Sequence, residues 1–231
     1  MQIKQIMKRL ADAGWMARVI EVLDHRSDNR MTELGMLSQA FEFAKINHVP
    51  GDYFEFGLWR GKTFGYAHRM KLRYGRRDMK LWGFDSFQGL PATEKHPDNI
   101  WYEGQFACTR PEFEAILASR GIHPSEYGLI QGFYNESLND DAHRRLSGRQ
   151  AAVIYVDCDL YDSTIQVLNF IEPYIVNGSI ICFDDFYNYK GDPAQGEQKA
   201  LAEFMQQQPQ LDFIPYLDYA PLGKSFICRL K

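Results

Sequence analysis

The sequence predicts an α/β fold: a seven-stranded, mostly parallel sheet with helices on both faces and an antiparallel last strand. From about residue 52 onward, short β-rich runs alternate with helical stretches, a pattern typical of a parallel sheet covered by helices. The last two β-rich runs are joined by a segment too short for a parallel crossover, so they should pair antiparallel. A chain of 231 residues, 45% of them hydrophobic, is long enough to bury one such core.

Each predicted strand is a short β-rich run, and helices are expected between them. The strands are, in chain order, Asp52–Phe56, Lys80–Phe84, Tyr127–Gln131, Ala151–Val156, Ser179–Phe183, Leu211–Leu217 and Ser225–Leu230. The helices are Lys62–Tyr74, Pro111–Arg120, Ser163–Ile175 and Gly196–Gln207, and Pro215–Gly223 should form the last turn. The one long irregular segment, Leu90–Thr109, is rich in Pro, His, Trp and Tyr, so we expect a binding loop there.

Two helices are expected before the first strand. Residues 1–23 place apolar side chains at helical spacing and lack the uninterrupted apolar core of a signal peptide. Residues Thr32–Ile46 repeat the amphipathic pattern, with Thr32 as the N-cap. We therefore divide the chain into an N-terminal helical section, residues 1–48, that acts as a lid or cap, and a main domain, residues 49–231.

Composition narrows the classes of partner. With 26 basic and 30 acidic residues, the net charge is −4, which disfavours nucleic acid as a general partner. No apolar run approaches the roughly 18 residues of a membrane span. The four cysteines (Cys108, Cys158, Cys182 and Cys228) lack metal-binding spacing, which favours a reduced, cytoplasmic protein. We expect a small-molecule partner, and a homo-oligomer is compatible with the sequence.

The first candidate site is the turn after the first strand, in GDYFEFGLWRGKTF. Gly57 and Gly61 let the backbone approach a ligand closely, and a helix begins at about Lys62. The spacing has one residue too few for a nucleotide-binding P-loop. Glu55, at the end of the strand, would repel a pyrophosphate and suits an ammonium or hydroxyl group. The turn therefore indicates a zwitterionic ligand, unless it is only a tight turn.

Asp85 ends the second strand, in LWGFDSFQGLP. A carboxylate there offers two acceptor oxygens to the hydroxyls of a ribose, and Phe84 or Phe87 could lie against an adenine. Alternatively, Asp85 caps the turn before Ser86. The end of the third strand, Gln131–Phe133, either borders an adenine or forms a turn.

The strongest signal is a set of four acidic residues at two further strand ends. Asp157 and Asp159 lie two apart, so in extended backbone their carboxylates share a face, and Asp184 and Asp185 end the next strand. Two carboxylates about 4 Å apart repel by roughly 4 kcal/mol at an effective dielectric constant near 20. Such a site favours a hard divalent cation, Mg²⁺ before Mn²⁺ or Ca²⁺. Helix capping or solvent exposure would explain one or two of these residues, but not four.

Four motifs in this order resemble those of the class I S-adenosylmethionine-dependent methyltransferases, and among them the macrocin-type sugar O-methyltransferases of antibiotic biosynthesis. They are VPGDYFEFGLWRGKT, GFDSFQGLP, VDCDLYDST and FDDF, and the resemblance runs from Val49 to the end of the chain. It implies a Rossmann-like methyltransferase domain and an O-methyltransferase that uses Mg²⁺. The implied acceptor is a sugar diol first and a catechol-like phenol second.

The resemblance also implies a role for each site residue. Asp159 would be the general base, and Asp157, Asp184 and Asp185 would hold the metal ion. S-adenosylmethionine would be bound by Glu55, Gly57, Gly61, Thr63, Asp85, Ser86, Phe87, Gly132 and Phe133. The chain departs from the family pattern in having Lys62 in place of a second glycine, and in its short N-terminal section.

Two other classes of function are open on the sequence. Asp157-Cys158-Asp159 is also the DxD pattern with which some glycosyltransferases bind Mn²⁺ and a sugar nucleotide, although Glu55 in the first turn argues against a diphosphate. A non-catalytic binding protein could keep the same fold, although the complete acidic set argues against that.

Overall fold

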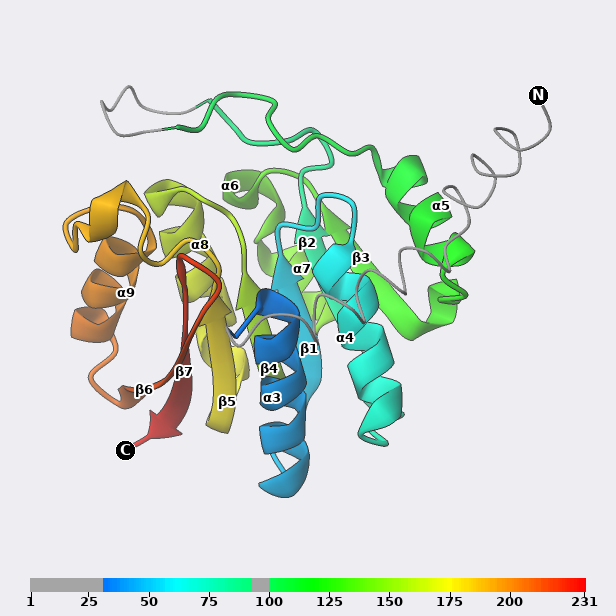
Figure 1. Cartoon of the computed structure of the whole chain (residues 1–231), viewed down its shortest axis with the longest axis horizontal. Helices are drawn as coiled ribbons and strands as arrows, with labels where there is room; N and C mark the ends of the chain where they lie inside the picture. Colours follow the sequence, from blue (N-terminus) through cyan, green and yellow to red (C-terminus); the bar gives the residue numbers. More distant parts are fainter. Residues whose placement is uncertain (1–30, 93–99) are drawn as a thin grey trace.

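In the computed structural model, which describes residues 31–92 and 100–231, one mixed sheet forms the centre of the molecule (Figure 1). The strand order is β3-β2-β1-β4-β5-β7-β6, and β7 is antiparallel to both of its neighbours. The strands are β1 (Asp52–Phe56), β2 (Leu81–Asp85), β3 (Tyr127–Gln131), β4 (Ala151–Val156), β5 (Ile175–Phe183), β6 (Leu211–Tyr219) and β7 (Gly223–Leu230). The predicted sheet, with its antiparallel last strand, is confirmed.

Helices cover both faces of the sheet. They are α3 (Glu33–Ile46), α4 (Lys62–Arg73), α5 (Arg110–Ser119), α6 (Tyr134–Ser137), α7 (Asp140–Arg145), α8 (Tyr161–Ile171) and α9 (Gly196–Gln207). Three short 3₁₀ segments are η1 (Pro124–Glu126), η2 (Glu172–Tyr174) and η3 (Tyr189–Gly191). Buried residues of α3, α4 and α5 share one core with one face of the sheet, and those of α7, α8 and α9 share the other core.

Side chains alternate between the two cores along each strand, as the pleat requires. In β1, Tyr53 belongs to the core beneath α3 and α4, whereas Phe54 and Phe56 belong to the opposite core. All five residues of β1 are buried, as expected for a central parallel strand. The central strands therefore leave only their ends for a polar site.

Helix α3 is built into the core. Its buried side chains, among them Leu37 and Phe41, are fully enclosed and pack in the same cluster as Tyr53 and Phe64. Thr32 is its N-cap and accepts a hydrogen bond from the Gly35 N–H at 3.1 Å, as predicted. The first predicted helix, residues 1–23, lies outside the described residues.

The boundaries of several elements differ from the prediction. Helix α8 ends at Ile171, and β5 already begins at Ile175. The last turn is much shorter than Pro215–Gly223, because β6 continues through Pro215 to Tyr219. Pro215 is tolerated because β6 is an edge strand with a register shift after that residue. Within the described residues, no helix is both long and apolar enough to cross a membrane.

Candidate functional site

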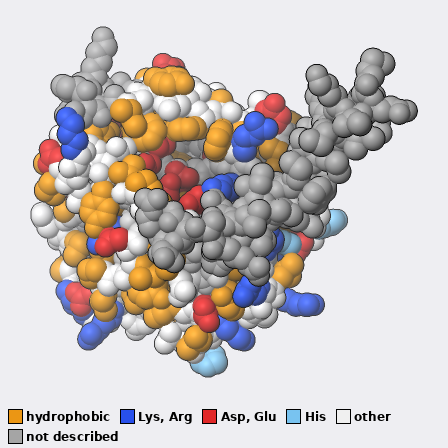
Figure 2. Space-filling view, in the orientation of Figure 1, with side chains coloured by type: hydrophobic (Ala, Val, Ile, Leu, Met, Phe, Trp, Pro, Cys, Tyr) orange, Lys and Arg blue, Asp and Glu red, His pale blue; other side chains and the backbone are white. Residues whose placement is uncertain are grey.

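A cavity of about 630 Å³ lies at the carboxyl ends of the parallel strands, a size in the usual range for small-molecule sites. The described parts of the segment between β2 and α5, residues 86–92 and 100–109, run over this edge of the sheet (Figure 1). Figure 2 shows acidic side chains in a hollow on this face, with basic atoms beside them. The predicted site residues that line the cavity are Gly57, Thr63, Asp85, Ser86, Gly132, Phe133, Asp157, Asp159, Asp184 and Asp185.

Glu55 does not line this cavity, although the sequence predicted a role in binding the ligand there. It is completely buried beneath the turn, where its Oε1 accepts the Thr63 hydroxyl at 2.6 Å. The Tyr53 hydroxyl also donates to the Glu55 carboxylate. Burial raises the pKa of Glu55 to about 8. Its position is therefore that of a support for Thr63 and the turn.

Gly61 and Phe87, also predicted to bind the cofactor, face α5 instead of the cavity. The Arg120 guanidinium donates a hydrogen bond to the Gly61 carbonyl. The Phe87 ring is buried with its centroid 5.7 Å from that of Phe113. Gly61 and Phe87 thus contact α5 and its end on the side of the turns away from the cavity, and the neighbouring residues Lys62 and Ser86 line the cavity.

Gly57 joins the end of β1 to the end of β4. Its φ is +87°, and a Cβ built on it would lie 1.7 Å from the carbonyl oxygen of Asp157. The Asp157 N–H donates to the Phe56 carbonyl at 2.8 Å, which holds the two strand ends together. Only glycine meets both requirements, a left-handed backbone and the close approach of a second chain segment.

Asp85 binds the loops on either side of it. Its Oδ2 accepts the Leu58 N–H and its Oδ1 accepts the Phe87 N–H, both at 2.6 Å. Burial raises its pKa, while these backbone hydrogen bonds act in the opposite direction. Asp85 therefore caps the turn before Ser86, which was one of the two predicted roles, and it also lines the cavity.

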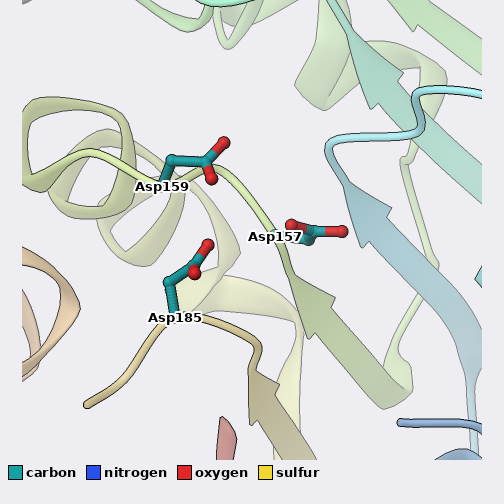
Figure 3. Close-up of side chains that lie close together, drawn as sticks. All are labelled: Asp157, Asp159 and Asp185. Carbon is teal, nitrogen blue, oxygen red and sulfur yellow. The ribbon is translucent and has the colours of Figure 1, made fainter. Parts of the chain in front are cut away.

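Three carboxylates gather beyond β4 and β5 (Figure 3). One oxygen from each of Asp157, Asp159 and Asp185 lies within 4.8 Å of the others. The predicted extended backbone does not bring Asp157 and Asp159 together. Asp159 instead has φ +63°, a left-handed conformation that is uncommon outside glycine and typical of functional sites when it occurs.

Burial raises the pKa values of the carboxyl groups in this cluster. Burial, and then the neighbouring Asp185, raise the pKa of Asp159 to about 9. The pKa of Asp157 is raised well above its usual range by burial and by Asp184. Carboxyl groups in this state either hold protons or bind a metal ion.

Asp184 lines the same cavity but is not one of the three carboxylates of this cluster. Its Oδ1 accepts the hydroxyl of Tyr155, which lies on the neighbouring strand β4, at 2.5 Å. Burial and Asp185 raise its pKa to about 7. The oxygens that lie within 4.8 Å of one another thus come from Asp157, Asp159 and Asp185, whereas the resemblance implies Asp157, Asp184 and Asp185 as metal ligands and Asp159 as the base. Tyr155 gave no signal in the sequence, because it is one aromatic residue in a buried strand.

Aromatic side chains stand at the entrance of the cavity. Trp59 is 51% exposed, and its ring centroid lies 5.6 Å from that of Phe106. Trp101 is 5.8 Å from Phe106. Phe106 and Trp101 come from Leu90–Thr109, and residues of this segment line the cavity, as expected of a binding loop.

Comparisons with known proteins agree with this geometry. The model of a family described as Macrocin-O-methyltransferase (TylF) matches residues 27–214. The chain is 29% identical over 165 residues to Mycinamicin III 3''-O-methyltransferase of Micromonospora griseorubida, covering 68% of this chain and 63% of that protein. It is 30% identical over 161 residues to Demethyldecarbamoylnovobiocin O-methyltransferase of Streptomyces niveus, covering 65% and 58%. Both matches span less than two thirds of the relative.

Two solved structures share the fold. The O-methyltransferase NovP superposes with a TM-score of 0.68 at 24% identity, covering 86% of this chain and 79% of that one. The calicheamicin methyltransferase CalS11 gives a TM-score of 0.69 at 24% identity, covering 84% and 77%. At 24% identity, these two similarities support the fold of this chain and no finer property.

The contact at Gly57 gives a test of stability. Gly57→Ala should lower the free energy of unfolding in urea by about 3 kcal/mol or more, because backbone strain and overpacking add. Gly75→Ala is the matched control, since Gly75 has φ +69° but nothing within 4 Å of its Cβ position. That variant should lose only about 1–2 kcal/mol. Equal losses in the two variants would show that Gly57 is needed for its backbone angle alone.

Proposed function

Because the chain belongs to the macrocin-O-methyltransferase family, we propose that it is an S-adenosylmethionine-dependent O-methyltransferase acting on a hydroxyl group of a sugar or other small natural product. The observation that carries the proposal is that the glycine turn and the carboxylate cluster line the same cavity. A methyl donor and an acceptor hydroxyl can therefore meet in a shared, partly enclosed space. The comparisons give no support to the glycosyltransferase interpretation.

The cavity surface suits S-adenosylmethionine. Gly57 lines the cavity with its backbone alone, and Thr63, which also lines it, is the second residue of α4. The Asp85 carboxylate already accepts backbone N–H groups from the turns beside it, and a carboxylate has about four acceptor sites, so it can also accept a ribose hydroxyl. Ser86, Gly132 and Phe133 complete the wall on the adenosine side. When bound, S-adenosylmethionine supplies an electrophilic methyl group on a sulfonium sulfur.

The carboxylate cluster suits Mg²⁺. Asp157, Asp159 and Asp185 offer only oxygen ligands, which hard divalent cations prefer. Burial raises the pKa of each of these carboxyl groups, and a bound divalent cation would favour their charged forms. We infer that these three residues hold the metal ion. Asp184, through Tyr155, would then position the end of β5.

The acceptor hydroxyl must lose a proton as it is methylated, and we assign the general base to Asp159. A carboxylate has two oxygens, so Asp159 can share in holding a cation and still accept a proton from a hydroxyl. The strained backbone of Asp159 fixes this side chain at the cavity surface. The remaining rate enhancement would come from holding the hydroxyl and the methyl group in line.

A sugar diol is the proposed acceptor, with a catechol-like phenol as the second choice. Two neighbouring oxygens can bind a metal ion together, which fixes the direction of the reacting hydroxyl. The relatives described above are named for O-methylation of mycinamicin III at its 3'' position and of demethyldecarbamoylnovobiocin. The aromatic side chains at the entrance suit an acceptor with an apolar portion.

Two further predictions concern the N-terminal section and the cellular location. The lid or cap proposed for residues 1–48 has support only at Glu33, the first residue of α3, which lines the cavity; the buried apolar side chains of α3 belong to the core, and residues 1–30 lie outside the described residues. The four cysteines are free and buried, which supports a cytoplasmic location.

The cofactor assignment predicts that S-adenosylhomocysteine binds with a micromolar dissociation constant in calorimetry. Asp85→Ala should weaken binding by about 1–3 kcal/mol, because the ribose would lose its buried acceptor. Asp78→Ala, an exposed carboxylate outside the cavity, is the control and should bind as the wild type does. Absence of heat with both S-adenosylmethionine and S-adenosylhomocysteine would contradict the cofactor assignment.

The metal assignment predicts that chelator-treated protein binds one Mn²⁺ or Mg²⁺ per chain. Asp157→Asn, Asp159→Asn and Asp185→Asn should each lower the affinity for Mn²⁺ by about 10-fold or more, and Asp184→Asn by less, because Asp184 is turned to Tyr155. If Asp184→Asn loses metal while Asp159→Asn retains it, the ligand set is the one predicted from the sequence.

The general-base assignment predicts a loss of rate that metal cannot restore. With a glycoside acceptor found by screening, Asp159→Asn at saturating Mg²⁺ should lower the maximal rate by about 10²–10⁴-fold. Asp157→Asn should recover part of its rate as Mg²⁺ is raised, and Asp140→Asn, an exposed control, should be unaffected. A nearly wild-type rate for Asp159→Asn would place the base elsewhere.

A further inference from the structure

The charges around the cavity are strongly unequal. Acidic side chains line it from Glu33 and Asp85 on one side to Asp157 and Asp185 on the other. Among the described residues that line it, Lys62 is the one basic residue. Among the described side chains of the cavity wall, Lys62 is therefore the one that can offer a positive charge to an anionic group on a ligand.

The position of Lys62 is set by helix α4 and by an ion pair with Glu33. It is the first residue of α4, directly after the Gly61 turn and next to Thr63, and its side chain is 47% exposed. Its Nζ donates to a carboxylate oxygen of Glu33, the first residue of α3. The pair thus joins the starts of two helices at the cavity. Lys62 is also the residue at which the chain departs from the glycine expected at this position.

S-adenosylmethionine carries a carboxylate and an ammonium group at its amino-acid end and no other anionic group. The acidic wall suits the ammonium group, but it repels the carboxylate. We propose that Lys62 binds the carboxylate of S-adenosylmethionine, and that Glu33 holds the Lys62 side chain when the cofactor is absent; this assignment rests on the proposed function.

The chemistry of the two side chains supports this arrangement. A lysine ammonium has three donors on a flexible stem, so it can contact a ligand carboxylate without fully leaving Glu33. The N–H groups at the start of the twelve-residue helix α4 add to the attraction for an anion. Glu33 opposes binding, because it places a second negative charge near that carboxylate. Lys62 therefore favours the intact amino-acid end of the cofactor over adenosine alone.

Calorimetry with two ligands tests the proposal on the full chain. S-adenosylhomocysteine has the carboxylate, and 5′-methylthioadenosine has the adenosine and sulfur but no amino-acid end. Lys62→Met should lower the affinity for S-adenosylhomocysteine by about 10-fold and leave the affinity for 5′-methylthioadenosine within about twofold of wild type. Lys62→Arg should restore most of the affinity. Glu33→Gln should raise the affinity for S-adenosylhomocysteine by about 2–5-fold, because a competing negative charge is removed.

Lys45→Met is the matched control, because it removes the same charge from an exposed position of α3 outside the cavity, and it should bind both ligands as wild type does. The proposal is overturned if Lys62→Met binds S-adenosylhomocysteine as tightly as wild type, or if it loses both ligands equally. If the wild type binds neither ligand, the proposed function fails together with this inference. Binding of both by the wild type with no effect of Lys62 overturns this inference alone.

Discussion

The carbonyl oxygen of Asp157 lies where a side chain on residue 57 would begin, and this contact brings the two parts of the site together. Because β1 and β4 are neighbouring parallel strands, their carboxyl ends meet at one edge of the sheet. The absence of a Cβ on Gly57 lets the glycine turn pack directly against the start of the acidic segment. A ligand over the turn is then next to the carboxylate cluster. Glu55 and Thr63 stabilise this turn from beneath, and Asp85 holds its Leu58 N–H from the side.

Buried negative charge is the second constraint on this site. Asp157, Asp159 and Asp185 lie close together in a setting that raises the pKa of each carboxyl group. A divalent cation would relieve this repulsion and would also give an acceptor hydroxyl a fixed place. The same acidic surroundings make the single basic residue that the structure describes on the cavity wall, Lys62, selective for an anionic group. In the proposed function, the metal ion, the acceptor and the cofactor would therefore share one electrostatic environment.

The sequence predicted the sheet and most of the cavity wall, because parallel strands place their carboxyl ends at one edge, and Asp85, Asp157 and Asp184 directly follow apolar runs. It missed α6 and α7, which have four and six residues and show little periodicity. It could not predict which carboxylate oxygens lie within 4.8 Å of one another, because the position of Asp159 depends on a left-handed backbone and Asp184 accepts a hydrogen bond from Tyr155, 29 residues away. Nor could it distinguish Glu55, which supports the turn, from residues that face the ligand, because the two positions differ only in burial.

The most direct test of the account is a crystal structure of the full chain with S-adenosylhomocysteine and Mn²⁺, with the metal located by its anomalous scattering. The account predicts one metal ion within coordination distance of carboxylate oxygens of Asp157, Asp159 and Asp185. It also predicts S-adenosylhomocysteine in the same cavity, with its ribose at Asp85. A metal ion bound away from this cluster, or S-adenosylhomocysteine bound outside this cavity, would contradict it.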